Sequence, residues 1–255
     1  MTRVVLALAA RALRNAARRP QFLAPLVVFP TLFLAINVGG LQRTTALPGF
    51  PEVDGFLDFQ LAGAMTQSLL LGGVSTGIAT ALEIEGGFFD RLVAAPIPRV
   101  AIVLGRLVAA GAIAALQVAW FLVLGLLFGA GVEGGPLGVL ALFAIGVLAG
   151  TGFAAIGVVL ALRARSASTV QGIFPLVFVV LFVSSAFFPA PLLAAPADAI
   201  AAYNPLSWIA EGLREPLAFG RALAPIAKGL AAAAGVAIVA SALAVLALRG
   251  RLRAA

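Results

Sequence analysis

The sequence predicts an all-α integral membrane protein with six transmembrane helices. Its mean hydropathy is +1.13 over 255 residues, 62% of which are hydrophobic and only 11% charged. Several uncharged stretches of about 20 residues can each cross a hydrocarbon layer about 30 Å thick. These stretches must be helical, because the bilayer offers no water to pair with their backbone groups. We expect one transmembrane domain over residues 1–255.

The six predicted spans are bounded by charged residues or by turn residues. They cover residues 22–41, 59–82, 107–128, 137–162, 170–188 and 229–248. Pro25, Pro30 and Pro175 fall inside spans, where neighbouring helices can satisfy the backbone groups that proline leaves unpaired.

Basic residues are divided unequally between the two sides of these spans. One side holds only four of the seventeen, which are Arg43, Arg214, Arg221 and Lys228, and leaves thirteen to the other. Lys and Arg accumulate on the cytoplasmic side of membrane proteins. Both termini are therefore predicted to be cytoplasmic, in a multi-pass protein of the cytoplasmic membrane.

Residues 2–19 are predicted to form an interfacial helix on the membrane surface. At about 100° per residue, Arg3, Arg11, Arg14 and Arg18 share one face, and apolar residues turn away from it. The apolar run that follows exceeds the roughly 7 to 15 residues of a signal peptide, and no cleavage pattern comes after it. The helix can bind anionic lipid, contact a partner or serve as a topogenic anchor.

A charged segment at residues 83–99 interrupts the apolar sequence between the second and third spans. Drawn as one helix, it places Glu83 and Asp90 on one side and pairs Phe88 with Leu92 on the other. Prolines then end it. Because so short a helix cannot form a core, it is suited to contact another protein. An ordinary loop whose aromatic residues lie on the membrane is the alternative.

The predicted spans hold neutral polar residues but no acidic residue in their interiors, which disfavours ion-coupled carriers. Four of the polar residues form a candidate translocation path for a hydrophobic or amphipathic substrate: Gln67, Ser68, Gln117 and Gln171. Hydrogen bonding between helices is the alternative role. Small-residue motifs at 73–77, 125–129 and 146–150 predict close helix packing, within one subunit or between two.

Several chemistries have no residues to support them. The chain has no cysteine and no histidine, which excludes disulfides and the usual thiolate and imidazole metal sites. It also lacks the Gly-x-x-x-x-Gly-Lys-Ser/Thr loop that binds nucleotide phosphates, and any Ser/His/Asp constellation. We therefore expect no catalytic, metal or cofactor site in this chain. The net charge of +7 is attributed to membrane topology and not to nucleic-acid binding.

The predicted external segment at 189–223 contains five prolines, with Tyr203, Trp208 and several aliphatic residues between them. This composition predicts one or two short helices that dip into the outer membrane interface.

Several motifs, in order and with matching spacing, resemble the ABC-2 type permease family. They are Arg18-Arg19-Pro20, Glu83-Ile84-Glu85-Gly86-Gly87, Asp90-Arg91-Leu92, Ala95-Pro96, Arg99, Gly105-Arg106, Phe187-Phe188-Pro189, and Asn204-Pro205-Leu206-Ser207-Trp208 with Glu211 and Arg214. Many relatives carry threonine and tyrosine where this chain has Ser207-Trp208.

The resemblance implies a permease subunit of the daunorubicin-exporter or nodulation-factor-exporter kind. Two such subunits pair with two cytoplasmic ABC ATPase subunits, which would bind ATP and Mg²⁺. By position, the coupling element includes Glu83, Glu85, Gly86, Arg91 and Pro96, and we expect Phe88, Phe89 and Leu92 to receive the push of the ATPase. The external gate includes Asn204, Pro205, Trp208 and Arg214. Drugs, lipids and lipid-linked glycans all remain candidate cargo, and a membrane scaffold or a secondary carrier are the alternative functions.

Overall fold

The computed structural model describes residues 1–253, except for the side chains of Phe22 and Phe174. Helices account for all regular structure in this range, which confirms the predicted all-α class. The α-helices are α1 (Thr2–Ala17), α2 (Pro20–Leu41), α3 (Phe56–Glu85), α4 (Phe88–Ala94), α5 (Arg99–Leu127), α6 (Gly135–Ala164), α7 (Ala167–Gly172), α8 (Phe174–Phe182), α9 (Ala197–Tyr203), α10 (Pro205–Arg214) and α11 (Leu223–Arg253). Three short helices, η1 (Gln42–Ala46), η2 (Ala190–Leu192) and η3 (Glu215–Phe219), complete the order. Residues 254–255 of the predicted domain lie outside the described range.

Within residues 1–253, four helical stretches are long and apolar enough to cross a membrane. They are Leu23–Ala46, Arg99–Leu127, Gly135–Ala164 and Leu223–Arg253, and they contain most of the predicted first, third, fourth and sixth spans. The predicted second span falls on α3, which has 30 residues but carries Thr66, Gln67 and Ser68 in its middle and is less apolar.

The predicted fifth span, 170–188, is not one helix. It is divided between α7 and α8, and α8 ends at Phe182. Pro175 lies in the first turn of α8, where its missing N–H would have no helical partner, so it begins a helix there. Two other prolines lie inside the continuous helix α2, as predicted.

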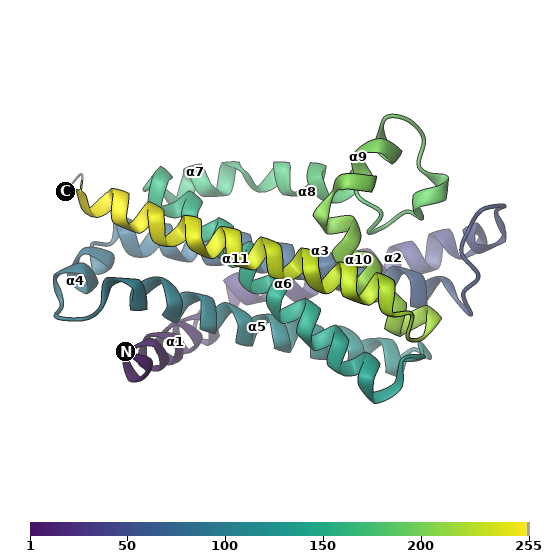
Figure 1. The fold of residues 1–255 in the computed structure, drawn as a ribbon, viewed down its shortest axis with the longest axis horizontal. Helices are drawn as coiled ribbons and strands as arrows, with labels where there is room; N and C mark the ends of the chain where they lie inside the picture. The colour runs from purple at the N-terminus through teal and green to yellow at the C-terminus, as the bar shows by residue number, and fades with distance from the viewer. Residues whose placement is uncertain (254–255) are drawn as a thin grey trace.

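The long helices lie side by side, and both ends of the described chain lie at the same end of the bundle as α4 (Figure 1). We call this the terminal end. The opposite end, which we call the distal end, carries α9 and the connection at residues 42–55 (Figure 1). The termini and the segment 83–99 therefore share one end, as the distribution of basic residues predicts.

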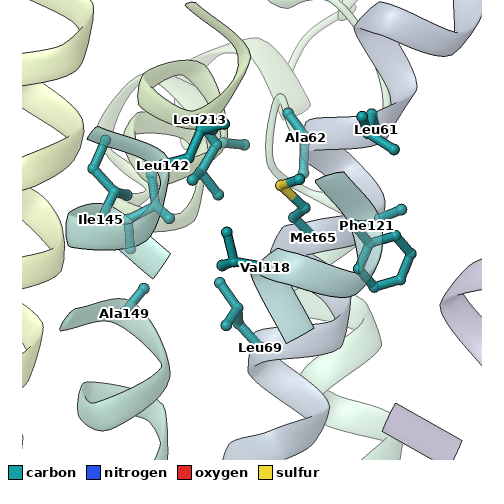
Figure 2. Packing of buried hydrophobic residues seen from close by; sticks show 14 of the residues in the cluster. Leu61, Ala62, Met65, Leu69, Val118, Phe121, Leu142, Ile145, Ala149 and Leu213 are labelled. Atoms are coloured by element: carbon teal, nitrogen blue, oxygen red, sulfur yellow. The ribbon is translucent and has the colours of Figure 1, made fainter. Parts of the chain in front are cut away.

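The core lies where α3, α5, α6 and α10 meet (Figure 2). Met65 and Leu69 of α3, Val118 of α5, Ile145 of α6 and Leu213 of α10 are each 1% exposed or less. In a membrane, lipid is as apolar as these side chains, so close packing contributes more to helix association than burial from water does.

Glycines allow α3 and α6 to approach closely. A Cβ atom on Gly73 would lie 2.6 Å from the carbonyl carbon of Phe153, and one on Gly77 would lie 2.9 Å from the Gly157 oxygen. Both distances are too short for a real side chain. The motif at 73–77 therefore packs within the chain, which was one of its two predicted roles.

Candidate functional site

The segment 83–99 differs from the single amphipathic helix predicted for it. Helix α3 continues to Glu85, two glycines form a turn, and α4 occupies only Phe88–Ala94. Gly87 has a φ of +69°, in the left-handed region that glycine adopts without steric cost. The predicted common face of Glu83 and Asp90 is therefore wrong, because the turn separates their helices.

The Glu83 carboxylate is shared by arginines from two other helices. Its Oε1 accepts a hydrogen bond from Nη1 of Arg11 in α1 at 3.1 Å, and its Oε2 accepts one from Nη2 of Arg106 in α5. Nη1 of Arg106 also donates to Oγ1 of Thr80 at 3.1 Å. The Arg106 side chain is only 12% exposed, so it needs such partners to offset its lost hydration. One carboxylate thus joins α1, α3 and α5.

Phe88 and Phe89 connect α4 to these arginines. The guanidinium carbon of Arg11 lies 3.5 Å from the centroid of the Phe88 ring, a cation–π geometry. Arg106 and Arg251 lie 6.0 and 5.0 Å from the Phe89 ring centroid. Phe89 is 1% exposed, so it is buried beneath α4 and a partner could displace it only through its neighbours.

The other two acids of the segment connect it to α7 and α11. Oε1 of Glu85 accepts a hydrogen bond from the Ala167 N–H at 2.8 Å, at the start of α7, where a negative charge is favourable. Oδ1 of Asp90 accepts one from Nη2 of Arg251 in α11 at 3.4 Å. Glu83, Glu85 and Asp90 together join the segment to four other helices.

The exposed residues of α4 and the turn after it are Asp90, Arg91, Ala94, Pro96 and Pro98, whereas Leu92 is half-buried. The exposed residues carry both signs of charge. With the exposed Glu85, Gly86 and Arg99, they form the part of the segment that a partner could reach.

Asn204 and Pro205 fix the start of α10 against α8. Oδ1 of Asn204 accepts a hydrogen bond from the Leu206 N–H at 3.0 Å, and its Nδ2 donates to the Val180 oxygen at 3.0 Å. Asparagine is a favoured residue at this capping position, and proline is favoured at the position that follows. The predicted short helices of the external segment are thus present as α9 and α10.

Arg214 holds the last turn of α10 against α3 and the chain after α8. Its Nε donates to the Phe59 oxygen at 3.1 Å, and its Nη2 donates to the oxygens of Ser185 at 3.1 Å and Ala186 at 2.7 Å. The guanidinium carbon also lies 3.8 Å from the Phe59 ring centroid. Burial lowers the pKa of Arg214 to about 10, so the group stays charged at neutral pH.

Trp208, the fourth predicted gate residue, lies on the partly exposed face of α10. Its Nε1 donates to the Ala202 oxygen at 3.0 Å, and Nζ of Lys228 lies 4.8 Å from its ring centroid. It therefore links α9, α10 and α11.

Two of the four candidate path residues are in contact with each other. Nε2 of Gln117 donates to the backbone oxygen of Ser68 at 2.8 Å and to its Oγ at 2.9 Å. Gln67 is 1% exposed, and neither of its amide atoms has a hydrogen-bond partner among the described residues. Gln171 lies apart, exposed on α7. Ser68 and Gln117 thus form hydrogen bonds between two helices, which was the alternative role predicted for these polar residues.

Sequence reasoning did not select Arg11, Arg106 or Arg251 as site residues. A signal existed for Arg106, because it begins a long apolar stretch, where a charged residue is costly unless it is paired. Its partners depend on which helices meet, and no local pattern gives that information.

Comparison with known proteins places this sequence in a family. Residues 3–218, which include α1, α4 and α10, match the ABC-2 type transporter family. The chain is also 30% identical to a daunorubicin resistance ABC transporter permease protein of Streptomyces coeruleorubidus, over 77% of this chain and 68% of that protein. The chain therefore belongs to the ABC-2 type transporter family and is a multi-pass membrane subunit of the kind that works with a separate ABC ATPase.

Proposed function

We propose that this chain is the permease subunit of an ATP-binding cassette exporter in the cytoplasmic membrane. Its substrate is a hydrophobic or amphipathic molecule, such as a drug, a lipid or a lipid-linked glycan. The drug-resistance function named for the relative supports this class of substrate. A second permease copy, identical or different, completes the membrane part. Two ATPase subunits, which bind ATP and Mg²⁺, supply the energy.

The proposed topology has six spans, formed by α2, α3, α5, α6, the pair α7 and α8, and α11. Both termini and α4 are cytoplasmic in this proposal, and α9 and α10 lie at the outer interface. The positive-inside rule supports it, because the helices and turns at the terminal end carry most of the basic residues.

The proposed coupling element is α4 with its preceding turn. The main observation that supports this proposal is the contact between Phe88 and Arg11, because Arg11 also forms a hydrogen bond with Glu83. An ATPase that moves the exposed face of α4 would move Phe88 against Arg11, and the shared carboxylate would pass the displacement to α1, α3 and α5. Side chains this closely packed transmit displacement because interiors are dense.

Substitution at Phe88 tests this coupling. In liposomes that contain the permease and its ATPase, Phe88→Asp should leave ATP hydrolysis measurable and lower substrate transport at least about tenfold, the effect of roughly 1.4 kcal/mol. Phe128→Asp is the matched control, because Phe128 is 73% exposed in the connection after α5 at the distal end. Unchanged transport in the Phe88 variant would contradict the coupling role. ATP hydrolysis without substrate movement in the wild type would favour a scaffold.

A further inference from the structure

A cavity of about 330 Å³ lies among α1, α2, α3 and α5, is also lined by Gly150 of α6, and extends from the terminal end of the bundle to the core residue Leu69. This volume falls within the range of small-molecule sites, roughly 300 to 1,000 Å³. The charged residues in its lining are Arg11, Arg19, Glu83 and Arg106, and the rest of it is lined mainly by apolar residues such as Leu23, Leu26, Leu69 and Ile113, together with the amide of Gln117. A ligand that fills it must therefore have a polar end and an apolar end.

The cavity is elongated along the helices. Its lining on α3 extends from Leu69 to Glu83, fourteen residues later, and on α5 from Arg106 to Gln117, eleven residues later. At about 1.5 Å per residue these distances are roughly 21 and 17 Å. Half of a hydrocarbon layer is about 15 Å thick. The whole cavity, with its charged end included, is thus about as long as one leaflet is thick.

The charged end carries an excess of positive charge. Three arginines and one carboxylate line it, which gives a net charge of +2. The exposed side chain of Arg19 makes no hydrogen bond or ion pair within residues 1–253. Arg11 donates one hydrogen bond to Glu83, out of the five N–H groups that a guanidinium offers. Donors for an anion are therefore present at this end.

We propose that the cavity binds one anionic lipid of the adjoining leaflet, with its headgroup at Arg19 and Arg11 and an acyl chain beside Leu23, Leu26 and Leu69. Charge-assisted hydrogen bonds from arginine select an anionic headgroup. A free anion would leave the apolar length unfilled, and a zwitterionic amphiphile would bring a second positive charge to the arginines. Occupancy requires neither ATP nor the ATPase, so the site goes beyond the proposed export function.

Ligand binding to the purified full chain tests the proposal. In phosphatidylcholine nanodiscs, native mass spectrometry should detect a one-to-one complex with dodecyl phosphate. Affinity for dodecylphosphocholine, which has the same tail, should be about tenfold lower, a difference of roughly 1.4 kcal/mol. Inorganic phosphate alone should form no such complex. Equal affinity for the two amphiphiles, or equal binding of inorganic phosphate, would overturn the proposal.

Two substitutions locate the site. Arg19→Gln should weaken dodecyl phosphate binding about tenfold, and Arg18→Gln, which removes the same charge from a neighbour outside the cavity lining, should not. Ala79→Trp should abolish the complex, because the exposed Ala79 lines the cavity and a large side chain there fills it. Arg19 and Ala79 are both exposed, so the Arg19→Gln and Ala79→Trp variants should fold. Equal weakening by the two arginine substitutions would show that surface charge alone attracts the probe, and undiminished binding in Ala79→Trp would place it elsewhere.

Discussion

Glu83 of α3 and Arg106 of α5 form an ion pair across the base of the α4 loop. The two residues are 23 positions apart and flank α4 in the sequence. The pair closes this loop into a unit whose two ends belong to different long helices. A force on α4 therefore reaches α3 and α5 together, and Arg11 extends the contact to α1.

Glu83→Gln should destabilise the protein by about 1–3 kcal/mol, because Arg106 is largely buried and loses its carboxylate partner. The measurement is the midpoint of thermal unfolding in detergent. Glu85→Gln is the control, since the exposed Glu85 accepts one backbone N–H and should cost less than about 1 kcal/mol. Equal midpoints for the two variants would show that the Glu83 pair contributes little.

Arg214→Met should lower stability by about 2–4 kcal/mol, because three backbone oxygens lose their donor at once. Arg214→Lys should lower it less, because an ammonium keeps the charge but lacks the fork of donors. The control is Arg43→Met, at an exposed position in η1. The midpoints of thermal unfolding give the order of stability of the three variants. The prediction would be contradicted if Arg43→Met had the lowest midpoint.

Gly77→Ala should destabilise by about 1–3 kcal/mol through overpacking against the backbone of α6. Gly235→Ala should leave stability unchanged or raised, because a Cβ at that position would meet nothing within 4 Å. The two substitutions add the same methyl group to two membrane helices. A lower unfolding midpoint for Gly77→Ala and an equal or higher one for Gly235→Ala are therefore the expected results.

The proposed cytoplasmic location of α4 can be checked with single cysteines, because the chain has none of its own. A membrane-impermeant maleimide should label Leu47→Cys in intact cells, and should label Ala94→Cys only after the membrane is made permeable. Both positions are exposed, and they lie at the distal and terminal ends. Labelling of Ala94→Cys in intact cells would reverse the proposed topology.

Hydropathy was sufficient to locate α2, α5, α6 and α11, because the lipid-facing surface of each requires a long apolar stretch. It could not locate the end of α8. The residues after Phe182 include Ser184 and Ser185 but are otherwise apolar, so the predicted span ran on to Phe188. The end of α8 is instead held by contacts such as the hydrogen bond from Asn204 to Val180, which joins distant parts of the chain. Local patterns carry no information on such contacts.

The segment 83–99 likewise combines features that its sequence predicts with features that depend on the rest of the fold. Its prolines and aromatic residues predicted a separate helix. The pair Gly86-Gly87 is typical of a turn, and the prediction of one continuous helix did not take it into account. The burial of Phe89 and the sharing of Glu83 depend on α1, α5 and α11 arriving from other parts of the sequence. These features required the folded structure.

The polar character of α3 has a consequence for biogenesis. This helix contacts most of the others and is long enough to span a membrane, but it is less apolar than the four helices that are apolar enough to do so, and the buried amides of Gln60 and Gln67 have no hydrogen-bond partner among the described residues. A helix of this kind enters lipid less readily when it is alone. During synthesis, α3 should therefore wait at the translocon until α5 and α6 emerge, and the hairpin of α5 and α6 should release it into the bilayer.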